Sequence, residues 1–400
     1  MALRCFLFAS FWLAGAGLFW LPPAASHEIS GYLEAEARLF PQSPIYPQQR
    51  DNNASLAASP EYYHEFENGS SFVCVLFGRL DSADTHRTHA DIRELNFLYL
   101  ADNWELTVGI DRVFWGVTEF YHLADIINQT DLVEELSAEE KLGQPMVHLS
   151  VPADWGVVDL FVMPWFRETT FPGSHGRLRF GIPVNTDETI YESAAGQHHV
   201  DVAARYSHTI GDVDFGIYQF YGTGREPSLV PGMTSQGGPE LRPFYQIISQ
   251  TGLDAQLVAG QWLFKLESIY RSGQGDGYFS GTGGFEYTLV AVAGTAMDVG
   301  ILAEYAYDER GNRSGTYYQN DFLLGMRLAA NDATGSELLL GAGYDFENRT
   351  KLISVEGGRR LNDHLKLTVK SAFFIDVGEN DILYDLRRDS FVRLILRYYF

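Results

Sequence analysis

The sequence predicts an all-β fold: a transmembrane, antiparallel, up-and-down β-barrel of about 18 strands, with 16 as the alternative number. Three observations support this fold class. Segments of about ten residues alternate between apolar and polar side chains, and the connections between them alternate between short and long. No segment after the N-terminal region is continuously apolar for long enough to cross a bilayer as a helix. Because hydrocarbon leaves no backbone polar group unpaired without a heavy cost, such a chain can cross a membrane only as a closed barrel.

The N-terminal region predicts export. Arg4 is followed by an apolar stretch over residues 5–21, then by Pro22-Pro23 and small residues up to Ser26. This order is typical of a secretory signal peptide, here residues 1–26, that is cleaved near Ser26. A transmembrane anchor is the alternative, since the apolar stretch is somewhat long for a signal. Residues 27–400 are expected to form one barrel without a second domain.

Composition excludes several classes of protein. The 400 residues include 46% hydrophobic residues at a mean hydropathy of -0.13, so the apolar residues are dispersed, as alternation requires. The net charge of -23 argues against a nucleic-acid partner, because phosphates demand clustered Lys and Arg. Cys74 is the single cysteine after the signal, which excludes an intramolecular disulfide and a cysteine-based metal site. We expect no cofactor and no metal.

The alternating segments assign side chains to two faces. The apolar parity is expected to face outward, and its clearest members are Leu95/Phe97/Tyr99, Trp104/Leu106/Val108/Ile110, Trp262/Phe264/Leu266, Phe285/Tyr287/Leu289, Val299/Ile301/Ala303/Tyr305/Tyr307, Phe322/Leu324/Met326/Leu328, Leu338/Leu340/Ala342/Tyr344/Phe346 and Leu365/Leu367/Val369. The other parity carries polar, small or charged residues and is expected to face the lumen. The same assignment places Gly325 and Gly341 inside, where an introduced Arg is expected to be tolerated.

Short turns recur between the segments, and longer connections lie between these turns. The short turns are expected at residues 68–71, 101–103, 210–212, 258–260, 331–335 and 361–364. Short connections on one side and long ones on the other are typical of barrel topology, with the long loops extracellular. A strand at residues 61–67, between strands near 29–39 and 72–80, brings the count to about 18.

Two connections are too long to be plain loops. In residues 113–144, the residues Phe120, Leu123, Ala124 and Ile127 share one helical face, and Ser137 with Glu140 forms a candidate capping box. We therefore expect a helix-containing loop that folds into the barrel mouth; a cap lying over the rim is the alternative. The second connection, residues 168–197, is rich in Arg and aromatic residues and is expected to form a lid or a substrate-gathering surface.

The last twelve residues carry a resemblance. From Val392 to Phe400, alternate residues are apolar and the other parity holds Arg393 and Arg397. This segment resembles the terminal strand of Gram-negative outer-membrane β-barrels, and the signal, the alternation and the turn asymmetry extend the resemblance to porin-type barrels. It implies residence in the cell outer membrane, contact with lipid and lipopolysaccharide, and recognition of Tyr398 and Phe400 by the barrel-assembly machinery. The oligomeric state stays open, with a homotrimer as one arrangement.

The resemblance implies an outer-membrane channel for passive diffusion of small hydrophilic solutes or ions, through a charged lumen narrowed by an inserted loop. Parity places a basic set in the lumen: Lys265, Arg271, Arg327, Lys366, Lys370, Arg393 and Arg397. The expected acidic set is Glu105 and Asp111 with Asp125, Asp131, Glu134 and Glu135 of the long loop. Basic residues facing acidic residues orient dipolar solutes and select ions by charge. The alternative is that these charges only pair with one another and keep the lumen hydrated.

A second class of function stays open: a structural or adhesive barrel, plugged by its own loops, that does not conduct. Apolar packing around Phe120, Ile126 and Ile127 that seals the lumen would favour it. An enzyme is not expected. Histidines lie near Ser193 and Ser207, but no recognisable nucleophile elbow accompanies them.

Overall fold

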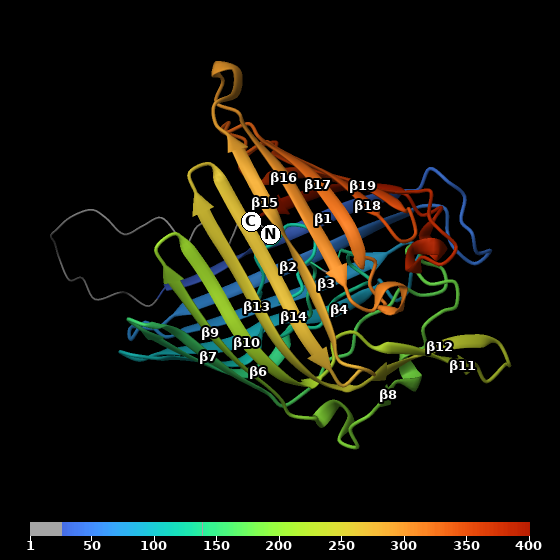
Figure 1. Ribbon diagram of the computed structural model, residues 1–400, viewed down its shortest axis with the longest axis horizontal. Helices are drawn as coiled ribbons and strands as arrows, with labels where there is room; N and C mark the ends of the chain where they lie inside the picture. Colours follow the sequence, from blue (N-terminus) through green and yellow to red (C-terminus); the bar gives the residue numbers. More distant parts are fainter. Residues whose placement is uncertain (1–25, 138) are drawn as a thin grey trace.

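The computed structural model describes residues 26–137 and 139–400, so the expected signal peptide lies almost wholly outside the described residues. Within these ranges, eighteen strands form one antiparallel sheet that closes on itself through the pairing of β1 with β21 (Figure 1). The strands are β1 (Ser26–Leu39), β2 (Asn53–Glu65), β3 (Ser71–Asp81), β4 (His89–Leu100), β5 (Glu105–Asp111), β6 (Gln144–Ala153), β7 (Gly156–Met163), β9 (Asp201–Ile210), β10 (Val213–Thr223), β13 (Ile247–Ala259), β14 (Trp262–Ser272), β15 (Tyr278–Leu289), β16 (Asp298–Asp308), β17 (Asn320–Ala329), β18 (Glu337–Asp345), β19 (Lys351–Arg360), β20 (Leu365–Ile375) and β21 (Phe391–Tyr399). The predicted number of strands is therefore confirmed.

Three shorter strands lie outside the barrel wall. They are β8 (Ile190–Tyr191), β11 (Ser228–Met233) and β12 (Pro239–Tyr245), and they form a separate three-stranded sheet. Short 3-10 helices occur at Thr186–Glu188, Gly196–His198, Val292–Gly294, Gly311–Arg313 and Ile382–Leu386. Among the described residues, no helix is long and apolar enough to cross a membrane. The strand expected at residues 61–67 belongs to β2, which begins earlier than predicted.

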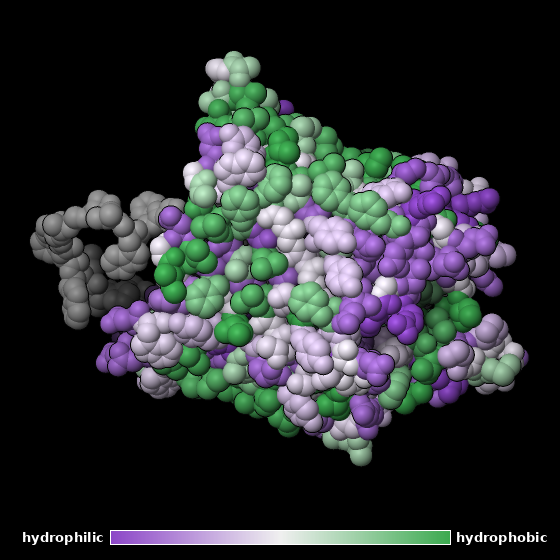
Figure 2. All heavy atoms as spheres, in the orientation of Figure 1, coloured by the Kyte–Doolittle hydropathy of each residue, from purple (hydrophilic) through white to green (hydrophobic). Residues whose placement is uncertain are grey.

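The predicted assignment of apolar side chains to the outer face of the barrel and of polar side chains to the inner face is correct. The outward side chains of Leu324 and Leu396 are 47% and 39% exposed, whereas Arg393, on the inward parity, is buried. Hydrophobic and weakly polar residues cover the strands, and hydrophilic residues gather at one end of the barrel (Figure 2). An apolar outer face on a closed barrel suits contact with lipid, and this is the architecture of an outer-membrane β-barrel.

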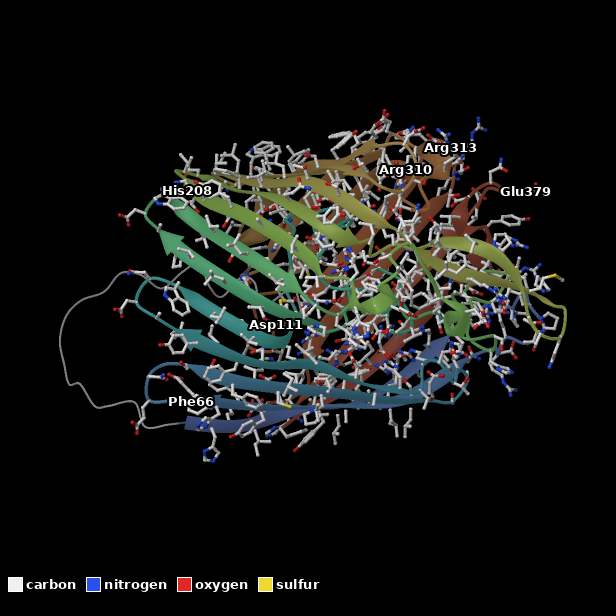
Figure 3. All side chains as sticks on the ribbon, turned by 90° about the horizontal axis from the view of Figure 1, so that it is seen from below. Phe66, Asp111, His208, Arg310, Arg313 and Glu379 are labelled. Carbon is white, nitrogen blue, oxygen red and sulfur yellow. The ribbon has the colours of Figure 1, made fainter. Side chains whose placement is uncertain are left out.

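Short and long connections lie at opposite ends of the barrel. All six predicted turns lie at one end, together with both termini of the sheet, whereas the connections 40–52, 112–143, 164–200, 224–246 and 376–390 lie at the other end. Figure 3 labels Phe66 and His208 at the end with the short turns, and Arg310, Arg313 and Glu379 at the end with the long connections. The predicted turn asymmetry is confirmed.

The connection from β5 to β6, residues 112–143, is called the inner loop below. The helix predicted there is wrong: its described residues contain turns and isolated bridges but no α-helix. Leu123, Ala124 and Ile127 are nevertheless all buried, so the apolar side chains reach a packed environment without helical periodicity. The backbone N–H groups of Glu119 and Ala124 donate to carboxylates of the barrel wall. An N–H group committed in this way is not available to a helical carbonyl four residues earlier.

Candidate functional site

A single carboxylate on β14 holds the tip of the inner loop. Glu267 is fully buried, and it accepts hydrogen bonds from Val117 N at 2.7 Å, Thr118 N at 3.0 Å, Thr118 Oγ1 at 2.7 Å and Ala124 N at 2.8 Å. Hydrogen bonds to an ionised acceptor are roughly twice as strong as neutral ones. Because Glu267 lies on the inward parity of β14, these bonds bring the tip of the loop against the inner wall.

A second carboxylate, on β16, holds the next residues of the loop. Glu304 accepts from Glu119 N at 2.7 Å and from Phe120 N at 3.1 Å. The ring of Phe120 then lies over the inner wall at Gly325 and Gly341, where an added Cβ would come within 2.9 Å and 3.1 Å of the ring. Both glycines face the lumen as predicted. The expected tolerance of Arg at these positions is no longer supported, because Phe120 occupies the space.

Next to these strands, the inner loop joins an apolar cluster that extends to β13, the neighbour of β14. Trp115, Ala124, Ile126 and Ile127 pack with Met146, Phe161, Met163, Ala203, Tyr218, Phe220 and Ile248 of strands β6, β7, β9, β10 and β13. Arg225 fixes this part of the loop, since its guanidinium donates to Ile126 O at 3.2 Å and to Ile127 O at 2.9 Å. The loop is thus attached to the wall along strands β6 to β16.

Ion pairs attach the second half of the inner loop to β3 and β4. Arg79 forms a salt bridge to Glu134 of the loop at 2.8 Å and another to Glu34 of β1 at 2.8 Å. Arg93 contacts Asp131 at 2.5 Å. Burial alone would raise the pKa of Asp131, but a hydrogen bond with His89 and the charge of Arg93 hold the pKa of this carboxyl well below its usual range. These carboxylates are therefore structural partners of the wall.

Each of the seven predicted basic residues contacts at least one acidic residue. Arg393 pairs with Glu36 at 2.6 Å, and Arg397 pairs with Glu34 at 2.5 Å. The remaining contacts are Lys370 with Glu135, Glu139 and Glu356, Lys366 with Glu337, Arg327 with Glu119 and Glu286, Lys265 with Glu119, and Arg271 with Glu226. The basic set therefore lies on β14, β17, β20 and β21, and each of its members is in an ion pair.

The predicted acidic residues differ from one another in their partners and in their exposure. Of the four in the inner loop, Glu135 meets the basic residues of the last two strands, at 3.0 Å from Lys370 and 3.8 Å from Arg393. Asp125 pairs within the loop, with Lys141 at 3.2 Å. On β5, Asp111 accepts from Asn96 at 3.1 Å and from the backbone of Arg112, while Glu105 is exposed near the end with the short turns. The structure thus brings one predicted loop acid to the basic residues of β20 and β21.

The connection from β7 to β9, residues 164–200, is called the outer loop below, and it crosses to the loop between β20 and β21. Arg177 donates to Asp389 at 2.7 Å, and Leu178 N donates to the other oxygen of the same carboxyl at 2.8 Å. Burial raises the pKa of Asp389, and the charge of Arg177 opposes that rise. Asp385 accepts from Gly181 N at 2.6 Å and from the Tyr46 hydroxyl. The outer loop therefore has contacts that would hold it as a lid over the mouth.

Charges along β17 to β20 keep contact with solvent. The side chains of Arg327 and Lys366 are 36% and 29% exposed, and those of Glu337 and Glu356 are 39% and 48% exposed. All four lie on the inward parity of their strands. This part of the interior is hydrated, in contrast to the apolar cluster on the side of β6 to β13.

Several residues of the site did not emerge from the sequence as site residues. Arg38, Arg79, Arg87 and Arg93 form the basic side of the ion pairs around β1 to β4. On β3, Val73, Val75 and Phe77 precede Arg79 on the inward parity, so both faces of this strand are apolar over most of its length. The signal that could have found Arg79 is therefore that it is the one basic residue of this strand, two positions before Asp81 at the extracellular end.

The hydrogen bonds to Glu267 give a test of how the loop is held. Glu267→Gln is expected to speed amide hydrogen exchange at residues 117–124 several-fold, because one of the two acceptor oxygens becomes an NH2 group that faces backbone N–H donors. The measurement is hydrogen exchange by mass spectrometry on the folded barrel.

Glu286→Gln is the matched control, since Glu286 pairs with Arg327 on the inner wall and accepts no hydrogen bond from the described residues of the inner loop. Equal exchange in both variants at residues 117–124 would show that Glu267 does not hold the loop tip.

Comparison with known proteins identifies the fold. No family model matches the sequence, and no curated protein sequence matches it. A BenF-like porin from Pseudomonas fluorescens superposes with a TM-score of 0.54 at 11% identity, covering 94% of this chain and 98% of that chain. OccK8 (OprE) of Pseudomonas aeruginosa gives 0.51 at 11% identity, with coverage of 94% and 98%. Wzi of Escherichia coli, described as a carbohydrate-binding β-barrel involved in group 1 capsule assembly, gives 0.52 at 12% identity, with coverage of 91% and 83%. The chain therefore has the fold of the outer-membrane porin-type β-barrels.

Proposed function

We propose that this barrel is an outer-membrane channel for passive diffusion of small hydrophilic solutes or ions, and that the inner loop narrows its lumen. The observation that carries the proposal is the row of solvent-contacting charges on the inward face of β17 to β20, including Arg327 and Lys366. A wall that served only to pack against a plug has no need of hydrated charges of both signs. The similarity to porin structures supports the fold that such a channel requires.

The contacts of the inner loop support the narrowing. Glu119 at its tip lies 2.7 Å from Arg327 and 3.6 Å from Lys265, so the tip places an acidic group directly beside basic groups of the wall. Oppositely charged groups across a narrow aqueous passage produce a transverse field. We therefore place the selective section of the channel beside the loop tip, at the level of Arg327 and Lys265.

A non-conducting barrel is the second candidate, and a specific observation favours it. Ile126 and Ile127 are buried in the apolar cluster, Phe120 covers the two wall glycines, and the outer loop is attached across the mouth. Such a plugged barrel would contribute to the envelope or adhere to a polymer, and the similarity to Wzi suits an outer-surface role of that kind.

Reversal potentials in a planar bilayer test the proposal. The double variant Arg327→Gln/Lys366→Gln is expected to shift selectivity toward cations, and Glu337→Gln/Glu356→Gln is expected to shift it toward anions. A unit charge about 7 Å from an ion in water contributes about 0.6 kcal/mol, with opposite sign for a cation and an anion, so each neutralised charge should change the cation-to-anion permeability ratio by about sevenfold.

These four positions are chosen because their side chains contact solvent. Neutralising Asp131 or Glu134 instead would remove one carboxylate partner of the buried Arg93 or Arg79 and would measure stability. A wild-type protein that inserts into the bilayer but passes no current would establish the plugged barrel in place of the channel.

A further inference from the structure

A hairpin loop projects from the barrel at the end with the short turns, and it is called the projecting hairpin below. It connects β15 to β16 over residues 290–297 and contains the 3-10 helix Val292–Gly294. In Figure 1 it is the orange segment at the top of the view, where it extends past the ends of β15 and β16. Figure 2 shows hydrophobic residues over the same projection. The proposed conduction path assigns no role to this hairpin.

The projecting hairpin differs in composition from every other connection at its end of the barrel. Its sequence is Val-Ala-Val-Ala-Gly-Thr-Ala-Met, which contains no charged residue and no Asp, Asn or Gln. Each of the other connections contains at least one Asp, Asn or Gln; they are residues 66–70, 101–104, 154–155, 211–212, 260–261, 330–336 and 361–364. Asp and Asn are favoured in turns because their side chains bond to the backbone. The hairpin therefore lacks the polar side chains of its neighbours.

The apolar side chains of the hairpin are exposed, and they continue the lipid-facing surface of the wall. Val290 is 62% exposed, and it follows Leu289, an outward residue of β15 that is 42% exposed. Ala291, Ala293 and Ala296 are exposed as well. A contiguous exposed apolar surface marks a site of contact. The surface with which this one is continuous is the face of the barrel that contacts lipid.

The backbone of the hairpin also suits a non-aqueous environment. Five of its N–H groups donate within the hairpin or to its base, namely Ala291 to Asp298 Oδ1, Val292 to Met297 O, Gly294 to Ala291 O, Thr295 to Val292 O and Met297 to Thr295 Oγ1. The Thr295 hydroxyl donates to Val292 O at 2.7 Å. An unpaired backbone group is costly in lipid. These bonds therefore reduce the cost of placing the hairpin among lipids.

The hairpin is held in a defined and partly strained conformation. Asn331 of the next turn donates from Nδ2 to Ala296 O and to Asp298 Oδ2, both at 2.8 Å. Ala291 and Ala293 adopt φ values of 53° and 55°, in the left-handed region that favours Gly and Asn. The hairpin thus carries methyl groups at positions where Gly or Asn would be less strained. It is a fixed projection with an apolar surface.

We propose that the projecting hairpin inserts into the periplasmic leaflet of the outer membrane, among the phospholipids beside β15 and β16. The short turns of such barrels are periplasmic, which places the hairpin at this leaflet. Lipid is favoured over a protein partner, because the surface of the hairpin continues the lipid-facing wall and its one hydroxyl group is already used internally. Apolar segments without charge partition into the membrane interface. The insertion would anchor one side of the barrel, and it does not depend on whether the barrel conducts.

Fluorescence quenching in lipid vesicles tests the insertion. In a chain without the expected signal peptide and with Cys74→Ala, the variant Ala293→Cys provides one site for the fluorophore NBD. Phosphatidylcholine with brominated acyl chains is expected to quench this label several-fold more strongly than a label at Ala333→Cys. Ala333 is the matched control, since it is an exposed alanine in the neighbouring polar turn. If iodide in the buffer quenches both labels equally and brominated lipid quenches neither preferentially, the hairpin lies in water and the proposal is wrong.

The ratio of protein to lipid separates lipid contact from contact between two copies of the chain. The vesicles contain no other protein, so lipid and a second copy are the two available occupants. Quenching of the label at position 293 that stays constant as the protein is diluted in lipid is the expected result. If the label is protected from iodide only at high ratios of protein to lipid, the hairpin contacts a second copy, and the assignment to lipid is refuted.

Discussion

Removal of residues 116–124, the tip of the inner loop, is expected to raise the single-channel conductance of the barrel several-fold in a planar bilayer. The narrowest section dominates the resistance of a water-filled channel, and an empty barrel of this many strands leaves an aqueous lumen. The tip lies against Glu267 on β14 and Glu304 on β16 and continues into the apolar cluster, so its removal opens the part of the cross-section beside these strands.

The deletion can be made without displacing the rest of the loop. Trp115 N donates to Asp125 Oδ1 at 3.4 Å, so a link of two glycines can join the cut ends. Ile126 and Ile127 keep their contacts with Arg225, and Glu134 keeps its salt bridge to Arg79. The carboxylates of Glu267 and Glu304 then face the opened lumen, where water can solvate them.

Removal of residues 234–238, the turn between β11 and β12, is the control for this deletion. That turn belongs to the small sheet outside the barrel wall, and its loss should leave the conductance unchanged. If both deletions leave the conductance at the wild-type value, the inner loop lies outside the conducting path, and the proposed narrowing is wrong.

The wall of the barrel was predictable because side chains along a strand alternate between its two faces with a period of two residues. On β18 and β17, each residue of one parity faces lipid and each of the other faces the lumen, so the sequence states the face directly. The turn asymmetry gave an independent check. Only the local limits of β2 were missed, because residues 53–60 contain Ala57, Ala58 and Pro60 and lack a strong apolar alternation.

The inner loop shows where periodicity misleads. Phe120, Leu123, Ala124 and Ile127 have helical spacing, yet the backbone between them bonds to Glu267 and Glu304, which lie about 150 to 185 residues later in the chain. The spacing of apolar residues within the loop cannot indicate a hydrogen-bond acceptor that comes from a distant part of the chain. Leu123, Ala124 and Ile127 are buried without a helix, because the wall carboxylates determine the conformation of the backbone between them.

The charged residues were predicted by face but not by partner. Parity placed Lys370 and Arg393 inside, and both are inside. Which acidic residue pairs with each of them depends on how far the inner loop extends into the barrel. No local sequence pattern predicts the position of that loop. On β3 the face itself was ambiguous, because Val75 and Phe77 point inward while Leu76 and Leu80 point outward. Arg79, the centre of the ion pairs between wall and loop, was missed for that reason.

Leu340→Arg is expected to destabilise the barrel by about 2 to 4 kcal/mol, if its place near the middle of β18 lies at the bilayer midplane. Leu340 faces outward with its cross-strand neighbours Met326 and Val355. Hydrocarbon provides neither water nor a counter-charge for a guanidinium at this depth. The free energy of unfolding can be measured by reversible urea unfolding in lipid vesicles, with tryptophan fluorescence as the signal.

Leu339→Arg is the matched control, because it changes the same residue type one position away on the same strand. Leu339 faces the lumen, where its cross-strand neighbours are Arg327 and the partly exposed Glu356, so water and a carboxylate are both within reach of the new charge. We expect it to cost much less than Leu340→Arg. Gly341→Arg, also inward, should not be mild, because the ring of Phe120 fills the space beside Gly341. Equal costs for the two leucine variants would mean that β18 does not separate lipid from a wet lumen, and the face assignment of the wall would have to be abandoned.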